Sequence, residues 1–159
     1  MAKKHRSLPE GLEVIGVTPA GDEHQVVTFT AKERSAFRDT VCPTCPWKKA
    51  NAGRFPPEAF KHSARTAYDM SQHIFSCHSA GLKEPTTCAG FLLRGAEHNM
   101  SVRMAVIRKQ LTSKPDEPDE PLFEGYRSMA IGNGVSPDDE ALEACRLSSY
   151  ELKDEGNGS

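Results

Sequence analysis

The spacing of four cysteines restricts the fold of this 159-residue chain more than any other feature of its sequence. They are Cys42, Cys45, Cys77 and Cys88, in the pattern C-x2-C-x31-C-x10-C. Two thiolates three positions apart can bind one ion from a single turn, and two more from separate elements complete a tetrahedron. The spacing therefore predicts a metal centre that joins three separate segments of the chain.

The prolines in "CPTCPW" bear on which metal is bound. In a zinc knuckle the residue after the second cysteine, often glycine, usually has positive φ, and neighbouring amides donate to sulfur. Pro46 cannot adopt positive φ and has no amide hydrogen, so this loop is not the usual knuckle. Cysteine followed by proline occurs in bacterial iron–sulfur loops. Closed four-cysteine sites are, however, typical of structural zinc. The sequence leaves two cofactors open, one Zn²⁺ or one [4Fe-4S] cluster.

Two other interpretations of the cysteines remain. "CPTC" resembles the active loop of glutaredoxins, in which Cys42 and Cys45 would form a thiol–disulfide pair. Pro46 disfavours helical angles at Cys45, and the βαβ order of that class is not found around the loop. Four ordinary buried cysteines in a reduced protein are the other alternative. Cys145 lies far along the chain and is predicted to be a lone thiol.

Composition and the lack of long apolar segments lead us to expect an intracellular protein, in a compartment where thiols stay reduced. Apolar residues make up only 37% of the chain, which favours a stabiliser in addition to the hydrophobic core. No stretch approaches the roughly 20 apolar residues that cross a bilayer, and the N-terminus lacks the apolar segment of a signal peptide. We therefore expect a cytoplasmic protein that does not bind membranes. Cysteines in that compartment bind metals or act in catalysis more often than they form disulfides.

The pattern of residues predicts an α+β fold. It consists of a small N-terminal β-hairpin, a central region with two or three helices around the four-cysteine metal centre, and a helical acidic C-terminal extension. The hairpin is predicted from β-branched runs at 12–17 and 24–30 around the turn sequence "TPAGDE". Proline at a helix start and apolar spacing predict a helix over 57–70, and "QHIFSCH" predicts a short strand that carries Cys77.

Further helices are expected after Cys77. Thr86 or Thr87 is expected to cap a helix that begins near Cys88 and breaks near Asn99, with a new cap at Ser101. Glycines after "RSMAI" predict a helix end, and Ser136 with Pro137 predicts another helix start. The expected organisation is a flexible leader at 1–10, a metal-centred domain at 11–114, a linker at 115–120, a helical extension at 121–150 and a disordered tail at 151–159.

Charge is distributed unevenly along the chain. Residues 1–115 carry 17 Lys and Arg against 10 Asp and Glu, a net +7, whereas residues 116–159 carry 3 against 12, a net −9. A basic body suggests an anionic partner, and nucleic acid could contact it through Arg94, Arg103, Arg108 and Lys109. A solvated helix face explains the same four residues without a partner. Phe91, Leu92, Val102, Val106 and Leu111 are expected in the core.

Several segments together resemble an uncharacterised family of small phage and actinobacterial proteins. They are "CPTCPW", "GRFPPEAF", "CH" at 77–78, "CAGFLLRGAEHN" and "VRMAV", over about residues 40–110, with "EPLFEGYRSMAIGNGV" as an extension. The resemblance implies that the four central cysteines occupy the family's cysteine positions and that Trp47 and His78 match its flanking pattern. It also implies a phage or prophage origin, and carries no activity.

The sequence contains no P-loop, dinucleotide fingerprint or catalytic triad order, and a site filled by four cysteines has no open position for catalysis. The working hypothesis is a non-enzymatic accessory or regulatory protein whose Trp47 shields the metal centre and whose His78 lies beside it. Its partner is expected to be a nucleic acid or a host or phage protein.

Overall fold

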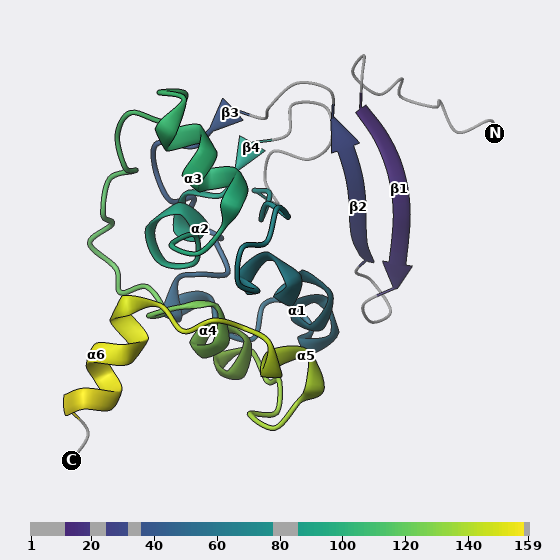
Figure 1. Ribbon diagram of the computed structural model, residues 1–159. Helices are drawn as coiled ribbons and strands as arrows, with labels where there is room; N and C mark the ends of the chain where they lie inside the picture. The colour runs from purple at the N-terminus through teal and green to yellow at the C-terminus, as the bar shows by residue number, and fades with distance from the viewer. Residues whose placement is uncertain (1–11, 20–24, 32–35, 78–85, 158–159) are drawn as a thin grey trace.

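The computed structural model describes residues 12–19, 25–31, 36–77 and 86–157, and confirms the α+β class (Figure 1). Its strands are β1 (Leu12–Pro19), β2 (Gln25–Ala31), β3 (Ala36–Phe37) and β4 (Thr86–Thr87). Its helices are α1 (Pro57–Ser63), α2 (Ala89–Arg94), α3 (Met100–Ile107), α4 (Tyr126–Gly132), α5 (Glu140–Glu143) and α6 (Ser149–Asn157), with the 3₁₀ turns η1 (Lys49–Asn51) and η2 (Ala64–Ala67).

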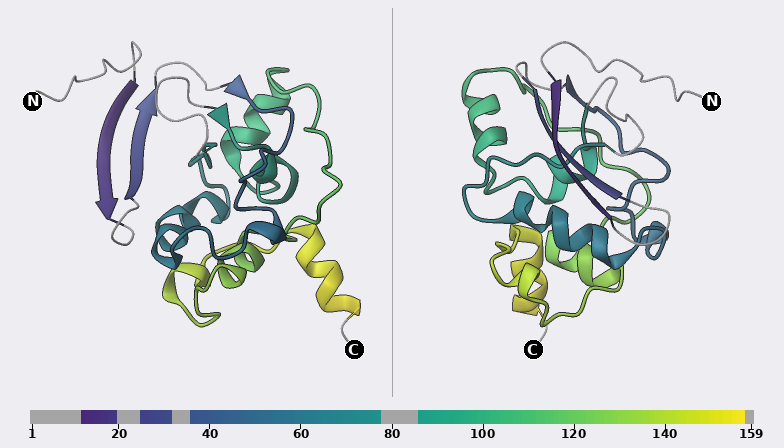
Figure 2. Two further views of the ribbon diagram at one scale, coloured as in Figure 1. Left: turned by 180° about the vertical axis from the view of Figure 1, so that it is seen from behind. Right: turned by 90° about the vertical axis from the view of Figure 1, so that its right-hand side faces the viewer.

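The predicted N-terminal hairpin is present. Strands β1 and β2 pair antiparallel from Leu12 opposite Ala31 to Pro19 opposite Gln25, with a register shift between Val14 and Gly16. Residues 20–23 of the predicted turn and the predicted leader at 1–10 lie outside the described residues. Figures 1 and 2 show the hairpin beside the helical body, with β2 on the side of α1.

A second, very small sheet brings two distant segments together. Strand β3 pairs parallel with β4, and Ser76 forms one antiparallel bridge with Thr87 on the other side. The strand predicted for "QHIFSCH" is therefore a single bridge. Thr86 and Thr87 form a strand rather than a helix cap, because their backbones pair with neighbouring segments on both sides. The result is that Cys77 and Cys88 leave the same small sheet.

Helix α1 is shorter than the predicted span of 57–70. It ends at Ser63 and continues as the tighter turn η2 until Tyr68, which is extended at φ −69° and ψ 149°. The Ser63 hydroxyl donates to the carbonyl of Ala59, and the Thr66 hydroxyl donates to the carbonyl of Ser63. Such side-chain bonds compete with the backbone bonds of a regular helix.

The predicted break near Asn99 is present, but the caps differ from the prediction. Cys88 itself occupies the N-cap position of α2. Asn99 caps α3, because its side-chain oxygen accepts from the Val102 amide at 3.1 Å while its amide donates to the carbonyl of His73 at 2.7 Å. Ser101, the predicted cap, instead donates to the carbonyl of Gln72.

The start of α5 differs from the prediction, whereas the end of α4 is as predicted. Asp139 caps α5 by accepting from the Ala141 amide at 2.9 Å, so the predicted Ser136 cap is wrong and the helix begins three residues later than Pro137. The predicted glycine stop of α4 is confirmed. Gly134 has φ +103°, and the Val135 amide donates to the carbonyl of Ala130, which closes the helix end.

One apolar core joins the central region and the C-terminal helices. Its fully or nearly fully buried side chains include Trp47, Phe60, Phe91, Tyr126, Met129 and Leu142. Residues 115–120 run along this body, since the Asp116 amide donates to the carbonyl of Asp39 at 2.9 Å. Val106 was expected in the core but is 54% exposed, because the new helix that begins at Met100 buries Val102 and Ala105 instead.

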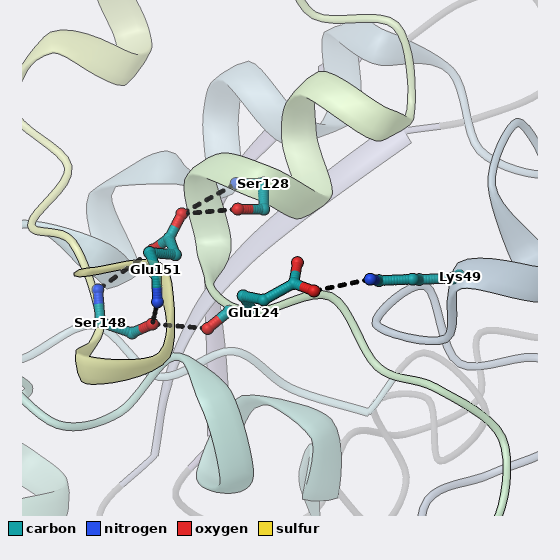
Figure 3. A network of polar contacts seen from close by, with 5 residues as sticks. All are labelled: Lys49, Glu124, Ser128, Ser148 and Glu151. Atoms are coloured by element: carbon teal, nitrogen blue, oxygen red, sulfur yellow. Dashed lines mark hydrogen bonds and ion pairs between the residues drawn. The ribbon is translucent and has the colours of Figure 1, made fainter. Parts of the chain in front are cut away.

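A buried carboxylate connects the starts of α4 and α6 (Figure 3). Glu151 accepts from the Ser148 amide at 3.1 Å, and the Ser148 hydroxyl accepts from the Glu151 amide at 3.1 Å, which is a capping box. The other Glu151 oxygen accepts from the amide and hydroxyl of Ser128 in the first turn of α4. This capping box stabilises the start of α6, which extends to Asn157. The sequence predicted disorder from residue 151, and this is wrong for residues 151–157. In Figures 1 and 2 it projects from the body.

None of the helices in the described parts of the chain has the length and apolar content needed to cross a bilayer.

Candidate metal centre

The Cys42–Cys45 loop consists of two successive tight turns. The Cys45 amide donates to the carbonyl of Cys42, and the Lys48 amide donates to the carbonyl of Cys45, both at 3.1 Å. The buried side chain of Asn51 donates to the carbonyls of Pro43 and Cys45, both at 2.9 Å. Asn51 was not singled out from the sequence, and its buried amide fixes the shape of the loop.

The small sheet presents the other two cysteines. The Cys77 amide donates to the carbonyl of Thr86 at 2.7 Å, and the Cys88 amide donates to the carbonyl of Phe75 at 2.9 Å. These two bonds hold the segments before Cys77 and Cys88 side by side. A ten-residue separation along the chain is thereby closed by backbone pairing.

All four cysteines are buried in one core cluster, with exposed fractions of 3% for Cys42, 1% for Cys45, 3% for Cys77 and 3% for Cys88. The Sγ atoms of Cys45 and Cys88 lie 3.7 Å apart. Zinc–sulfur bonds of about 2.3 Å at tetrahedral angles separate two ligand sulfurs by about 3.8 Å. This pair therefore has the separation of two ligands on one ion, which is also that of a thiol–thiolate hydrogen bond.

The other two cysteines act on this pair. A hydrogen bond with Cys42 helps to lower the pKa of Cys45, and the proximity of Cys77 helps to raise the pKa of Cys88. Within residues 12–19, 25–31, 36–77 and 86–157, no three Cys, His, Asp or Glu side chains already have the arrangement that holds a metal ion. Two of the four predicted ligands are thus at ligand separation, and the complete set of four remains a prediction.

The electrostatics of the site favour an anionic sulfur at Cys45. The pKa of Cys45 is lowered to about 7, and the largest cause is a hydrogen bond from Cys88. Burial acts in the opposite direction and raises this pKa. A hydrogen bond from the Trp47 backbone and the charge of Lys48 lower it further. The same bond, together with burial, raises the pKa of Cys88. Pro46 has no amide to donate, as predicted, but the next amide along the chain supplies the hydrogen bond to sulfur.

Trp47 is fully buried beside the cysteine loop. Its ring packs edge-on against Phe75 at 5.7 Å and Tyr126 at 6.0 Å between centroids. On α2, a Cβ at Gly90 would lie 2.6 Å from the Trp47 Cβ, and at the end of this helix one at Gly95 would lie 2.4 Å from its Cη2. Helix α2 therefore accommodates the indole only because these two positions lack side chains. The role of Trp47 as a shield remains a prediction, and His78 lies outside the described residues.

The fifth cysteine belongs to another part of the core. The Cys145 sulfur contacts the carbonyl of Ala64 at 3.6 Å, and burial raises its pKa to about 12. None of the five cysteines, all of which lie in the described parts of the chain, forms a disulfide.

The four basic residues singled out from the sequence have different surroundings. Arg94 donates to both carboxylate oxygens of Glu117, at 2.6 and 2.9 Å, and lies over the Tyr150 ring at 4.2 Å. Arg103, Arg108 and Lys109 are exposed on α3 and the turn after it. The side chains between them, Val106 and Ile107, are 54% and 70% exposed.

These observations define a small α+β protein with four buried cysteines in the same core cluster as a tryptophan. Residues 37–146 match DUF6283, a family of unknown function, and the chain belongs to this family. The matched span contains the four cysteines, Trp47 and the helices from α1 to α5, whereas the N-terminal hairpin precedes it. No curated protein and no solved structure has significant similarity to the chain.

Proposed function

We propose that Cys42, Cys45, Cys77 and Cys88 bind one Zn²⁺ ion as a structural centre in a non-enzymatic accessory or regulatory protein. The observation that carries this proposal is the 3.7 Å separation of the Cys45 and Cys88 sulfurs in a cluster of four buried thiols. A [4Fe-4S] cluster is the second cofactor. It is less well supported, because its cysteines bind different irons and so hold their sulfurs further apart than the ligands of a single ion.

Four protein ligands complete the coordination of zinc and leave no open position for water or substrate. The bound ion would supply cohesion between the Cys42–Cys45 loop and the small sheet, and no chemical step. This supports a structural role and argues against Lewis-acid catalysis.

A thiol–disulfide enzyme is the less favoured alternative. Thiol–disulfide exchange requires the attacking sulfur to reach a partner's disulfide. Cys42 and Cys45 are only 3% and 1% exposed, so neither sulfur is accessible from outside. The family match carries no activity that would change this preference. A cytoplasmic location fits thiols that remain reduced, and a phage or prophage origin rests on the sequence resemblance alone.

The exposed face of α3 is the proposed contact for a partner. The cations of this face, Arg103, Arg108 and Lys109, have the exposed side chains of Val106 and Ile107 between them. A protein partner with acidic and apolar side chains could cover both kinds of group. A phosphate backbone has no apolar surface to cover Val106 and Ile107, so a protein is the better match. Retention of the full-length protein on duplex DNA tests the alternative. A wild-type protein whose binding weakens steeply with salt, and whose Arg103→Glu, Arg108→Glu and Lys109→Glu variants bind less, would favour nucleic acid.

Cobalt substitution tests the metal proposal. Co²⁺ in a four-thiolate site gives intense visible d–d and sulfur charge-transfer bands, and we expect these for the wild-type chain at one ion per molecule. Cys88→Ser should weaken the charge-transfer band, whereas Cys145→Ser, the matched control, should leave both bands unchanged. A wild-type chain that gives no such bands, or equal losses in the two variants, would contradict the proposal.

A further inference from the structure

A zinc ion with four thiolates carries a formal charge of 2 − 4 = −2, as does a [4Fe-4S]²⁺ cluster with four thiolates. Burying an unpaired charge is costly, so such a centre needs cations or hydrogen-bond donors close to its sulfurs. This inference rests on the proposed metal function. It concerns two residues for which the cysteine spacing gives no indication.

Arg38 directs its guanidinium at the half of the site formed by the small sheet. It follows β3 directly, and its backbone amide donates to the carbonyl of Thr87 at 3.2 Å. Its Nε donates to the carbonyl of Thr40 at 2.9 Å, which orients the planar group. Its Nη1 then donates to the Cys77 sulfur at 3.7 Å. Three contacts thus hold one cation against one sulfur.

Lys48 lies at the other half of the site. It is 7% exposed, and its backbone amide closes the turn that begins at Cys45. Its positive charge makes a small contribution to lowering the pKa of Cys45. The ammonium also pairs with Glu120 at 3.5 Å, but that carboxylate is 56% exposed and therefore screened by water.

We propose that Arg38 and Lys48 are the two counter-charges of the metal centre, one for each half, and that they allow all four cysteines to bind as thiolates. Both are positioning residues, because they act through the ligand sulfurs and do not contact the ion. Their charges are opposite in sign to the formal charge of the centre, although Glu120 offsets part of the charge of Lys48.

The test is the Zn²⁺ affinity of the full-length protein, measured by competition with a chromophoric chelator at one pH and ionic strength. Loss of a group that supports a metal ligand typically weakens binding about 10- to 100-fold, so we expect this loss for Arg38→Met and for Lys48→Met. Arg54→Met and Lys49→Met, two exposed cations of the same region, are the matched controls and should bind as the wild type does.

A charge-retaining variant separates charge from packing. Arg38→Lys should recover most of the affinity lost in Arg38→Met, although it changes the shape of the side chain. The midpoint of thermal unfolding of the metal-free variants is the second readout. If the roles are electrostatic, these midpoints change little while the affinities fall, because the net charge of −2 arises only with metal and four thiolates.

Three results would overturn the inference, and they are distinguishable. Equal affinities for wild type, Arg38→Met and Lys48→Met would refute the counter-charges while leaving the metal site intact. A loss that Arg38→Lys does not recover, with a matching fall in metal-free stability, would show a packing role. A wild-type chain that binds no Zn²⁺ would refute the metal proposal itself.

Discussion

At the scale of single residues, the indole of Trp47 determines which side chains α2 can carry. Gly95 has φ −115°, which any residue can adopt, so glycine is needed there for space and not for backbone conformation. The six-membered ring of Trp47 occupies the place that a methyl group would take. The indole therefore lies directly against α2. Its buried Nε1 hydrogen has no acceptor among the described residues, so packing and not a hydrogen bond holds the ring in place.

Gly95→Ala should therefore destabilise the protein by about 1 to 3 kcal/mol, because the new methyl group overpacks against the indole. The measurement is urea unfolding followed by far-ultraviolet circular dichroism. The same substitution in a Trp47→Phe background should cost clearly less, since the shorter ring leaves room. Equal costs in the two backgrounds would show that the contact with Trp47 is not the cause.

At the scale of elements, Glu151 joins α6 to α4 by capping both helices. The sequence contains the capping-box signal, Ser148 followed three residues later by Glu151, but the acidic and glycine-rich end of the chain concealed it. A capping box predicts where a helix begins. It does not predict that the second carboxylate oxygen reaches Ser128, 23 positions earlier.

Glu151→Gln should lower the free energy of unfolding by about 1 to 3 kcal/mol, because the amide NH₂ faces a backbone donor that the carboxylate oxygen had accepted from. Glu143→Gln, at an exposed site on α5, is the matched control and should change it by less than about 0.5 kcal/mol. Chemical denaturation at neutral pH measures both. A Glu151→Gln chain as stable as the control would mean that the caps contribute little.

The pair of Arg94 and Glu117 holds the segment before α4 against α2, and it should respond to acid. The guanidinium lowers the pKa of Glu117 below its ordinary value of 4.5, so the folded chain binds this proton more weakly than the unfolded chain. The stabilisation is therefore complete above about pH 4.5 and is lost as the pH falls through the lower folded pKa. The effect should be below about 1 kcal/mol, because the Glu117 side chain is 54% exposed.

Unfolding measured from pH 6 to pH 3 tests this response. Glu117→Gln should lose less stability over that range than the wild type, whereas Asp119→Asn, two positions away, should follow the wild type. Identical slopes for wild type and Glu117→Gln would contradict the contribution of the pair.

The elements themselves were more predictable than their ends. Periodicity and turn residues indicated the hairpin, the break at Asn99 and the glycine stop after α4, since each depends on local chemistry. The caps at Cys88, Asn99 and Asp139 were missed, because several nearby side chains could cap and tertiary contacts select among them. The bridge at Ser76 depends on a strand that lies ten or more residues away, which local patterns do not reveal.

At the scale of the whole molecule, the cysteine cluster lies in the same core as the C-terminal helices. Leu122, Tyr126 and Leu142 pack in one cluster with Cys42 and Cys88. The sequence indicated the four cysteines as a set. It did not indicate that they share a core with the C-terminal helices, because the linker-like composition of residues 115–120 separates the two regions. An ion bound by the cysteines would therefore stabilise the entire body, including the helices after residue 121.

The most direct test of the account is the metal content of the full-length protein purified without oxygen. We predict a colourless protein with one zinc per chain, and one that loses the zinc in Cys45→Ser but keeps it in Cys145→Ser. If the protein is brown and contains iron and sulfide, the same cysteines bind an iron–sulfur cluster and not zinc. A metal-free protein in which the four buried thiols are unoccupied would contradict the account.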